Sequence, residues 1–212
     1  MSSLKQKFLI IKLSSIGDIV HALPFLRTLR VNYPNAHIAW IIEERFQDLI
    51  ECNSDLDEVI PVRIKYWRKN LNAKSWNEIC QTRKLLKNRR FDWTFDLQGL
   101  IKTGFIARMT GAPNRAGFHR DNCRERGNVW FNNRHSKHVT ADSHVVDLCL
   151  SQLSVLGNFP SRVEFPLTIR AEDERISETF MLENRELTDK PLIGINPGAG
   201  FPTKLWSIER YA

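Results

Sequence analysis

The sequence predicts a doubly wound α/β fold, in which helices cover both faces of a mostly parallel β-sheet. Short apolar runs alternate along the chain with segments whose apolar residues recur at helical spacing. The first apolar run, residues 7–12, is bounded by lysines, which is typical of a strand buried on both faces. Strands that alternate with helices are joined by right-handed crossovers, so we expect helices on both sides of the sheet.

The other elements follow from the same patterns. Apolar spacing over 19–32, with Pro24 in the opening turns, predicts a helix after a loop at 13–18. Further strands are predicted at 36–42, 58–62, 91–96 and 191–196. Further helices are predicted at 43–52, 74–90, 100–109, 138–156 and 171–184, and the one at 74–90 is basic and amphipathic. Ligands of such folds gather outside the carboxyl ends of the strands, which points to the loops 13–18, 97–99 and 197–204.

A connector at 158–168, which follows Gly157 and contains Pro160 and Pro166, divides the chain. We expect an N-terminal domain at 1–157 and the start of a second α/β domain at 169–212. Only 17 residues follow the strand at 191–195, too few to cover its edge, so we expect the second domain to be incomplete.

Composition excludes several classes of protein. With 42% hydrophobic and 26% charged residues the chain can bury a core, and it has no apolar run of the roughly 18 residues that a membrane span needs. The N-terminus makes a poor signal peptide, so we expect cytoplasmic residence. The four cysteines form no C-x-x-C pair, which argues against a zinc cage and favours buried free thiols.

The net charge of +7 is concentrated in two stretches. Residues 63–90 hold ten Lys or Arg against one acid, and residues 114–138 hold six against two. The rest of the chain therefore sums to −6. Such basic stretches attract nucleic acid, acidic lipid headgroups or a phosphorylated or carboxylated substrate.

The loop after the first strand carries two hydroxyls, a glycine and a carboxylate at Ser14, Ser15, Gly17 and Asp18. Neither G-x-G-x-x-G nor a P-loop motif occurs in the chain, so no dinucleotide or P-loop site is predicted. Two interpretations stay open: these side chains cap the following helix, or Asp18 acts as a general base at the mouth of the sheet.

Several motifs together resemble the family 9 glycosyltransferases, the ADP-heptose:lipopolysaccharide heptosyltransferases, most closely their heptosyltransferase I branch. The collinear matches are residues 8–24 (FLIIKLSSIGDIVHALP), 40–44 (WIIEE), 59–62 (VIPV), 65–69 (KYWRK), 91–102 (FDWTFDLQGLIK), 124–125 (RE), 196–200 (NPGAG) and 204–212 (KLWSIERYA). Each motif is weak by itself, and their common order over essentially the whole chain carries the resemblance.

The resemblance implies a GT-B fold, in which two Rossmann-like domains face each other across a cleft. An acceptor-binding N-terminal domain and a nucleotide-sugar-binding C-terminal domain would transfer heptose, with inversion, from ADP-heptose to a Kdo residue of the lipopolysaccharide inner core. The resemblance implies no metal and no cofactor besides the donor substrate. It also implies an enzyme on the cytoplasmic face of the inner membrane, in peripheral contact with anionic lipid.

The resemblance also suggests site residues. Asp18 matches the catalytic base, and the hydroxyl and glycine positions beside it would lie on the acceptor side. The other implied acceptor-binding residues are Ser14, Ser15, Gly17, Lys65, Arg68, Lys69, Gln98 and Arg124. A donor diphosphate would meet Gly198, Gly200, Thr203 and Lys204. Gln98-Gly99 could bind acceptor or simply form a turn, and His21 and His144 match family histidines but are more typical of packed helical residues.

One departure from the family pattern stands out. The family continues with the rest of the donor domain, including an Asp-[ST]-Gly-x-x-His segment that this sequence does not contain. We therefore expect a partial chain with impaired activity. Two other classes stay open: a noncatalytic protein that binds lipopolysaccharide or anionic membrane, and a nucleic-acid-binding module, for which no motif is visible.

Overall fold

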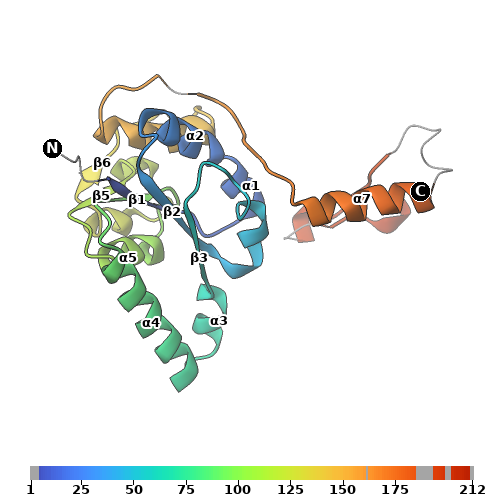
Figure 1. Ribbon diagram of the computed structural model, residues 1–212, viewed down its shortest axis with the longest axis horizontal. Helices are drawn as coiled ribbons and strands as arrows, with labels where there is room; N and C mark the ends of the chain where they lie inside the picture. Colours follow the sequence, from blue (N-terminus) through green and yellow to red (C-terminus); the bar gives the residue numbers. More distant parts are fainter. Residues whose placement is uncertain (1–4, 161, 185–192, 199–201, 211–212) are drawn as a thin grey trace. The chain divides into compact units, whose positions relative to one another are not determined.

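A computed structural model of the chain describes residues 5–160, 162–184, 193–198 and 202–210. The chain divides into two compact units, Met1–Thr168 and Ile169–Ala212. The first unit contains the sheet (Figure 1). That the second unit is the start of a nucleotide-sugar-binding domain stays a prediction, as do the domain bounds and the linker at 158–168.

The first unit is built on a six-stranded sheet in the order β3-β2-β1-β4-β5-β6. All five strand pairs are parallel, and the strands are β1 (Lys7–Ile11), β2 (His37–Glu43), β3 (Glu58–Val62), β4 (Trp93–Asp96), β5 (Asn114–Gly117) and β6 (Arg134–His135). This is the strand order of a Rossmann sheet, with the direction of winding reversing between β1 and β4. The predicted doubly wound fold is confirmed.

Helices connect the strands. The α-helices are α1 (Ile16–Val20), α2 (Leu23–Asn32), α3 (Ile64–Lys69), α4 (Ala73–Arg89), α5 (Ile101–Met109), α6 (Val145–Ser151) and α7 (Ala171–Glu183). Short 3₁₀ helices are η1 (Glu44–Leu49), η2 (Arg120–Asn122), η3 (Arg126–Trp130), η4 (Gln152–Val155), η6 (Pro202–Lys204) and η7 (Ile208–Arg210). Among the residues that the structure describes, no helix is long and apolar enough to span a bilayer.

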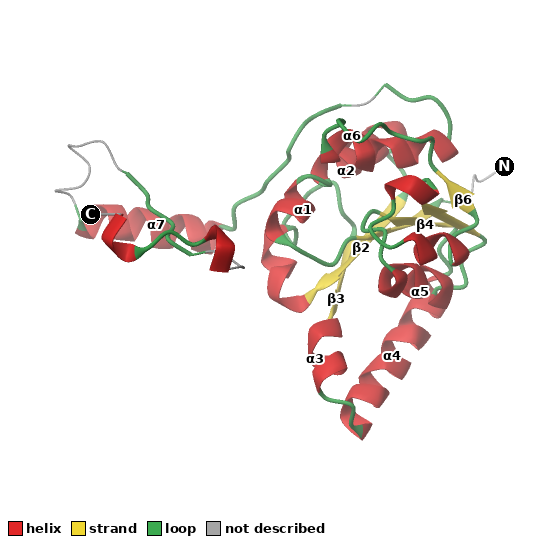
Figure 2. Cartoon of the chain, turned by 180° about the vertical axis from the view of Figure 1, so that it is seen from behind, coloured by secondary structure: helices red, strands yellow, loops and turns green. Residues whose placement is uncertain are grey.

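Two apolar layers sandwich the sheet, because successive side chains of a strand point to opposite faces. Phe8 and Ile10 of β1 pack with α2, α6 and η4 on one face. Leu9 and Ile11 pack with α3, α4 and α5 on the other. Figure 2 shows the two helical layers on either side of the strands. Helices on both faces leave the carboxyl ends of the strands as the edge where loops can gather a site.

The helix predicted at 19–32 is in fact two helices, and the loop predicted at 13–18 ends earlier. The first helix, α1, ends at Val20, four residues before Pro24. A proline ring clashes with the carbonyl of the residue four positions earlier, so a continuous helix is blocked there, while Pro is tolerated in the first turn of α2. Asp18 consequently lies inside α1 rather than in a loop.

Three other predicted elements were wrong in part. The segment at 43–52, predicted as a helix, forms only the 3₁₀ helix η1. The helix predicted from residue 138 begins at 145, because His144 Nδ1 caps α6 there by accepting the Val146 amide at 3.2 Å. In the segment at 191–196, residues 193–196 are irregular rather than a strand, and 191 and 192 lie outside the described residues. Strands β5 and β6 were not predicted.

The connector at 158–168 packs against the rest of the first unit. The Arg162 amide donates to Thr28 Oγ1 at 3.0 Å, and Asn53 Nδ2 donates to the Pro166 carbonyl at 2.7 Å. Both contacts hold the connector against the elements that precede β3.

The four cysteines are free, as expected, but the predicted burial holds only for Cys149, and Cys123 is partly buried. Cys52 and Cys80 are exposed. Cys52 lies in the turn after η1 and Cys80 on the outer face of the basic helix α4.

Candidate functional site

The carboxyl ends of β1 and β4 carry the centre of the candidate site, and their loops are bound to each other. Gln98 Oε1 accepts the Leu13 amide, and Gln98 Nε2 donates to the Ser14 carbonyl, both at 2.8 Å. Lys12 Nζ donates to the Leu97 carbonyl at 2.6 Å. These three bonds fix the backbone from which α1 begins.

Gln98 is only 3% exposed, and both ends of its amide are used in these bonds. It therefore positions the loop at 13–14. Binding of acceptor by Gln98 stays a prediction, and a side chain placed in this way would contribute to it through the loop that it holds.

Asp96, the last residue of β4, organises the second loop from inside the protein. Its carboxylate is fully buried and accepts hydrogen bonds from the Gln98 and Gly99 amides, from Thr103 Oγ1 and from Asn128 Nδ2. Burial raises the pKa of Asp96, and these four donors oppose that rise. The same carboxylate ties the β4 loop to α5 and to η3, so the loops of the site share one buried anchor.

Asp18 occupies the third position of α1 and completes a capping box with Ser15. Asp18 Oδ2 accepts the Ser15 amide at 3.0 Å and Ser15 Oγ at 3.2 Å. Its other oxygen, Oδ1, accepts a hydrogen bond from Arg124 Nη2 at 2.6 Å. The side chain is 17% exposed, so it is neither sealed in the core nor fully solvated. The capping interpretation is thus confirmed for this carboxylate. Its second oxygen also pairs with the Arg124 guanidinium.

Gly99 allows Arg124 to reach α1. It has a φ of +68°, and a Cβ added there would lie 3.0 Å from the ring of Phe118 and 3.3 Å from the Arg124 amide nitrogen. The Glu125 amide donates to the Gly99 carbonyl at 3.0 Å, and Glu125 Oε2 accepts the Ile101 amide. Glycine is required here both for the left-handed conformation and for the close passage of the segment around Arg124.

The surroundings of Asp18 keep it ionised. Partial burial raises the pKa of Asp18, but the Ser15 amide, the Lys12 ammonium and the Arg124 guanidinium outweigh it, and the pKa lies below its ordinary value. Lys12 itself is 2% exposed, and burial lowers its pKa while Asp18 and Asp96 oppose the shift. A buried ammonium beside the helix N-terminus was not predicted, because in the sequence Lys12 only marks the end of an apolar run.

A basic pocket of about 390 Å³ opens beside the same loop, on the α3 side. Its lining brings together four residues predicted for the acceptor side: Ser14, Lys65, Arg68 and Lys69. The pocket is also lined by Glu43, Arg45, Ile64 and Lys102. Five cations from three separate segments surround a single carboxylate, so the pocket suits an anion.

Three of these pocket residues were missed by sequence reasoning. Glu43 and Lys102 stand in the family-like motifs but were given no role, and Arg45 lies outside the two basic stretches. Glu43 Oε1 accepts the Lys65 amide at 2.9 Å, which fixes the start of α3 and its basic side chains at the end of β2. The pairing of β2 with β3 places Glu43 and Arg45 beside α3, and the pairing of β1 with β2 and β4 brings Lys102 to the same edge, so no local pattern could reveal them.

An apolar pocket of about 220 Å³ adjoins the basic one and shares Ile64, Arg68 and Lys102 with it. Leu71 lines it and is 90% exposed, and Phe105 lines it and is 54% exposed. The basic pocket therefore continues into an apolar surface between α3, α4 and α5.

Gly17, His21 and His144, which were also singled out from the sequence, lie on or next to the short helices α1 and α6. Gly17 lies in the first turn of α1 with open space around it. His21 and His144 lie at helix ends rather than inside one helix, with their rings edge to face at 5.2 Å.

The predicted donor residues belong to the second unit. Gly198 donates its amide to Asn196 Oδ1 at 3.1 Å, and Thr203 and Lys204 lie in η6. Gly200 lies outside the described residues. Their role in donor binding stays a prediction.

Comparison with known proteins gives a consistent result. Residues 79–212 match the model of glycosyltransferase family 9 (heptosyltransferase). Lipopolysaccharide heptosyltransferase 1 of Pseudomonas aeruginosa is 36% identical over 120 residues, which are 56% of this chain and 34% of that protein. The protein of the same name from Salmonella typhimurium is 30% identical over 143 residues, which are 66% of this chain and 44% of that protein. The chain spans less than half the length of these two curated relatives.

Solved structures agree in fold. The Escherichia coli heptosyltransferase WaaC with ADP-2-deoxy-2-fluoro heptose superimposes with a TM-score of 0.69 at 28% identity, covering 76% of this chain and 51% of that one. The glycosyl transferase family 9 structure from Veillonella parvula covers 99% of this chain and 59% of its own, with a TM-score of 0.78 at 24% identity. The second likeness bears on the fold alone.

Proposed function

Because this chain belongs to glycosyltransferase family 9, the heptosyltransferases, we propose that it supplies the acceptor side of an inverting heptose transfer in lipopolysaccharide inner-core synthesis. The donor is ADP-heptose, and the acceptor is a Kdo residue of Kdo–lipid A. The observation that carries the proposal is Asp18, an ionised and partly exposed carboxylate that follows the loop whose Ser14 lines a pocket with five cations.

In this reaction Asp18 is the general base. The acceptor hydroxyl oxygen attacks the anomeric carbon of the heptose, its proton passes to the Asp18 carboxylate, and the bond from that carbon to ADP breaks. Attack from the side opposite the leaving group inverts the anomeric centre. No step in this scheme calls for a metal ion or another cofactor.

Arg124 has two successive partners in the proposed cycle. Without acceptor it pairs with Asp18 and keeps that carboxylate a weak base. An incoming Kdo carboxylate competes for the guanidinium, since a carboxylate fits its fork of donors. Loss of the pair raises the pKa of Asp18 and makes it a better proton acceptor when the hydroxyl is in place.

The two adjoining pockets support a lipid-linked acid as the acceptor. The basic pocket provides ammonium and guanidinium groups for carboxylate and phosphate. The apolar pocket next to it, with exposed Leu71 and Phe105, suits the acyl region of the same molecule or of the membrane that holds it. We therefore propose peripheral contact with an anionic bilayer through the α3–α4 side of the first unit.

Binding of the acceptor tests the first half of the proposal. Kdo–lipid A in micelles is titrated into the 212-residue chain and into Arg68→Glu/Lys69→Glu, with Arg134→Glu/Lys137→Glu, two exposed cations away from α3 and α4, as a control of equal charge change. We expect the pocket variant to lose binding and the control to keep it. Equal loss in both variants would mean that only net charge matters.

Transfer tests the second half, with ADP-heptose, the same acceptor and the protein as the cell produces it. Asp18→Asn should bind Kdo–lipid A as the unmodified protein does and release no ADP above background. Turnover that survives in this variant would remove Asp18 as the base. Acceptor binding in the unmodified protein without any transfer would instead favour a noncatalytic lipopolysaccharide-binding role.

A further inference from the structure

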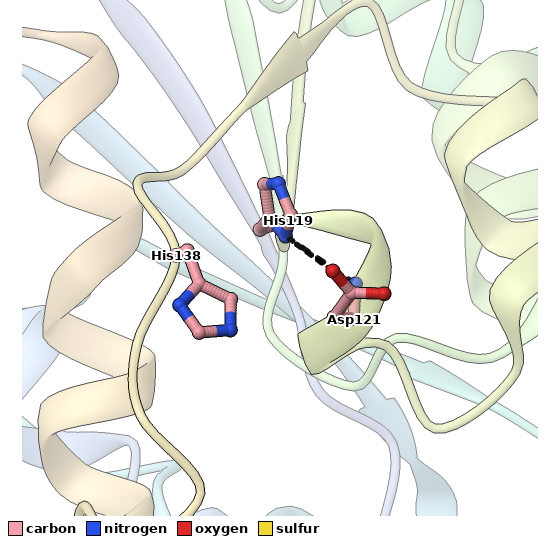
Figure 3. Close-up of side chains that lie close together, drawn as sticks. All are labelled: His119, Asp121 and His138. Atoms are coloured by element: carbon pink, nitrogen blue, oxygen red, sulfur yellow. Dashed lines mark hydrogen bonds and ion pairs between the residues drawn. The ribbon is translucent and has the colours of Figure 1, made fainter.

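A second cluster of polar side chains lies away from Asp18, at the carboxyl ends of β5 and β6. His119, Asp121 and His138 face one another there, and one nitrogen or oxygen atom from each lies within 4.8 Å of those of the other two (Figure 3). The sequence shows no metal-binding motif here, because the two histidines lie 19 positions apart in the chain. Imidazole and carboxylate together are ligands that zinc takes.

The ligand spacing fits this metal. His119 Nδ1 lies 3.6 Å from Asp121 Oδ2, and two ligand atoms of a tetrahedral zinc lie about 3.4 Å apart when each bond is about 2.1 Å. The His138 ring stands edge to face against the His119 ring, with centroids 5.2 Å apart. His119 and Asp121 are 41% and 56% exposed, so an ion can enter from solvent. The three ligand atoms lie within 4.8 Å of one another, so binding requires the side chains to rotate until these atoms are about 3.4 Å apart.

The backbone holds these residues together without a metal. Asn122 Nδ2 donates to the Val139 carbonyl at 2.7 Å, and the Val139 amide donates to Asn122 Oδ1 at 3.0 Å. The His119 amide donates to Ser136 Oγ at 3.3 Å. The segments on which the three side chains stand are therefore joined at two points, which lowers the entropy cost of assembling a site.

We propose that His119, Asp121 and His138 form a zinc site that clips η2 to the segment after β6. The ion closes the chain between residues 119 and 138, and Arg124 lies inside that closed segment. The zinc ion holds the segment that carries Arg124 in place, and the ion takes no part in the transfer chemistry itself. A metal that binds only the folded chain raises its stability, so bound zinc should raise the melting temperature.

The His21–His144 pair gives a matched control, because its rings also stand edge to face with centroids 5.2 Å apart. The background is the untagged chain with Cys52→Ser and Cys80→Ser, since both exposed thiols would bind zinc. Zinc is titrated by calorimetry into this protein, into His138→Gln and into His21→Gln. Circular dichroism and the melting temperature without metal check that each variant folds.

We expect one equivalent of zinc to bind and to raise the melting temperature, with both effects lost in His138→Gln and kept in His21→Gln. Mg²⁺ should produce neither effect, because it prefers oxygen ligands. The proposal is overturned if the background protein binds no zinc, if His138→Gln binds it equally well, or if only His21→Gln loses it.

Discussion

Arg124 Nη2 donates a hydrogen bond to Asp18 Oδ1 at 2.6 Å and so joins two residues 106 positions apart in the chain. The pair depends on Gly99, past which the segment around Arg124 runs, and on the buried Asp96 carboxylate that shapes the Gly99 loop. The electrostatic state of α1 is thus set by a residue from the opposite half of the sheet, across the point where its winding reverses.

Replacing Arg124 by Ala should raise the pKa of Asp18, because both a charge-assisted hydrogen bond and a nearby positive charge are lost. Carbon-13 NMR of the Asp18 carboxyl during a pH titration measures this directly. Arg126→Ala is the control, since Arg126 is exposed and lies in the same segment. An unchanged Asp18 titration in Arg124→Ala would show that the pair does not persist in solution.

The same variant has a predictable effect on stability against pH. A carboxyl whose folded pKa is lowered stabilises the protein above its unfolded pKa, and that stabilisation is lost as the pH falls through the folded value. Arg124→Ala should therefore unfold more easily at neutral pH, and the difference from the unmodified chain should shrink on acidification. Urea unfolding at several pH values checks this, and a difference that grows at low pH would contradict it.

The fold could be predicted from sequence wherever a buried element appears as a recognisable run or spacing of apolar residues. Strands β1 and β2 are buried almost throughout and appear as apolar runs. Strands β5 and β6 have the sequences Asn-Arg-Ala-Gly and Arg-His, with nothing to mark them locally. They are strands because β4 offers an edge to β5 and β5 offers one to β6, and such tertiary context outweighs propensity.

The site was predictable to the extent that its residues follow strand ends. Asp18 was found in this way, whereas the cations of α3 were predicted only from the family resemblance and the basic stretch at 63–90. Lys12, Glu43 and Asp96 were not predicted, because their roles consist of contacts with other loops: a bond to the Leu97 carbonyl, a bond to the Lys65 amide and four bonds from the β4 loop, α5 and η3. Each of these three residues bonds to at least one residue that is far away in the chain, and a single sequence does not indicate such contacts.

Gly99→Ala should destabilise the first unit more than Gly111→Ala does. Both glycines have positive φ, +68° and +74°, but a Cβ at Gly111 would meet nothing within 4 Å. Gly111→Ala should cost about 1–2 kcal/mol from backbone conformation alone. Gly99→Ala adds the clash with Phe118 and the Arg124 backbone. Urea unfolding of both variants measures the difference, and equal losses would show that the segment around Arg124 moves away freely.

Gln98→Glu should loosen the start of α1. Glutamate keeps the size of glutamine but loses the donor to the Ser14 carbonyl and places a buried carboxylate against that oxygen. We expect a loss of at least about 1–3 kcal/mol in unfolding free energy, the range for an unsatisfied buried polar group, because a buried charge costs more than a neutral group. Gln81→Glu, on the exposed surface of α4, makes the same chemical change and should have almost no effect. Similar melting temperatures for the two variants would count against a positioning role for Gln98.

Leu71→Glu/Trp76→Glu should abolish binding of the chain to vesicles that contain anionic lipid. These side chains are 90% and 69% exposed beside the apolar surface of α4, where burial in a bilayer would stabilise the complex and nearby Lys and Arg would attract acidic headgroups.

Val31→Glu/Val163→Glu is the control, because it removes two exposed apolar side chains, 45% and 59% exposed, from other parts of the first unit with the same change in charge. Co-sedimentation with vesicles of mixed phosphatidylglycerol and phosphatidylcholine separates the two effects. If both variants lose binding equally, attraction by net charge alone explains it, and if neither does, the α3–α4 side is not the membrane contact.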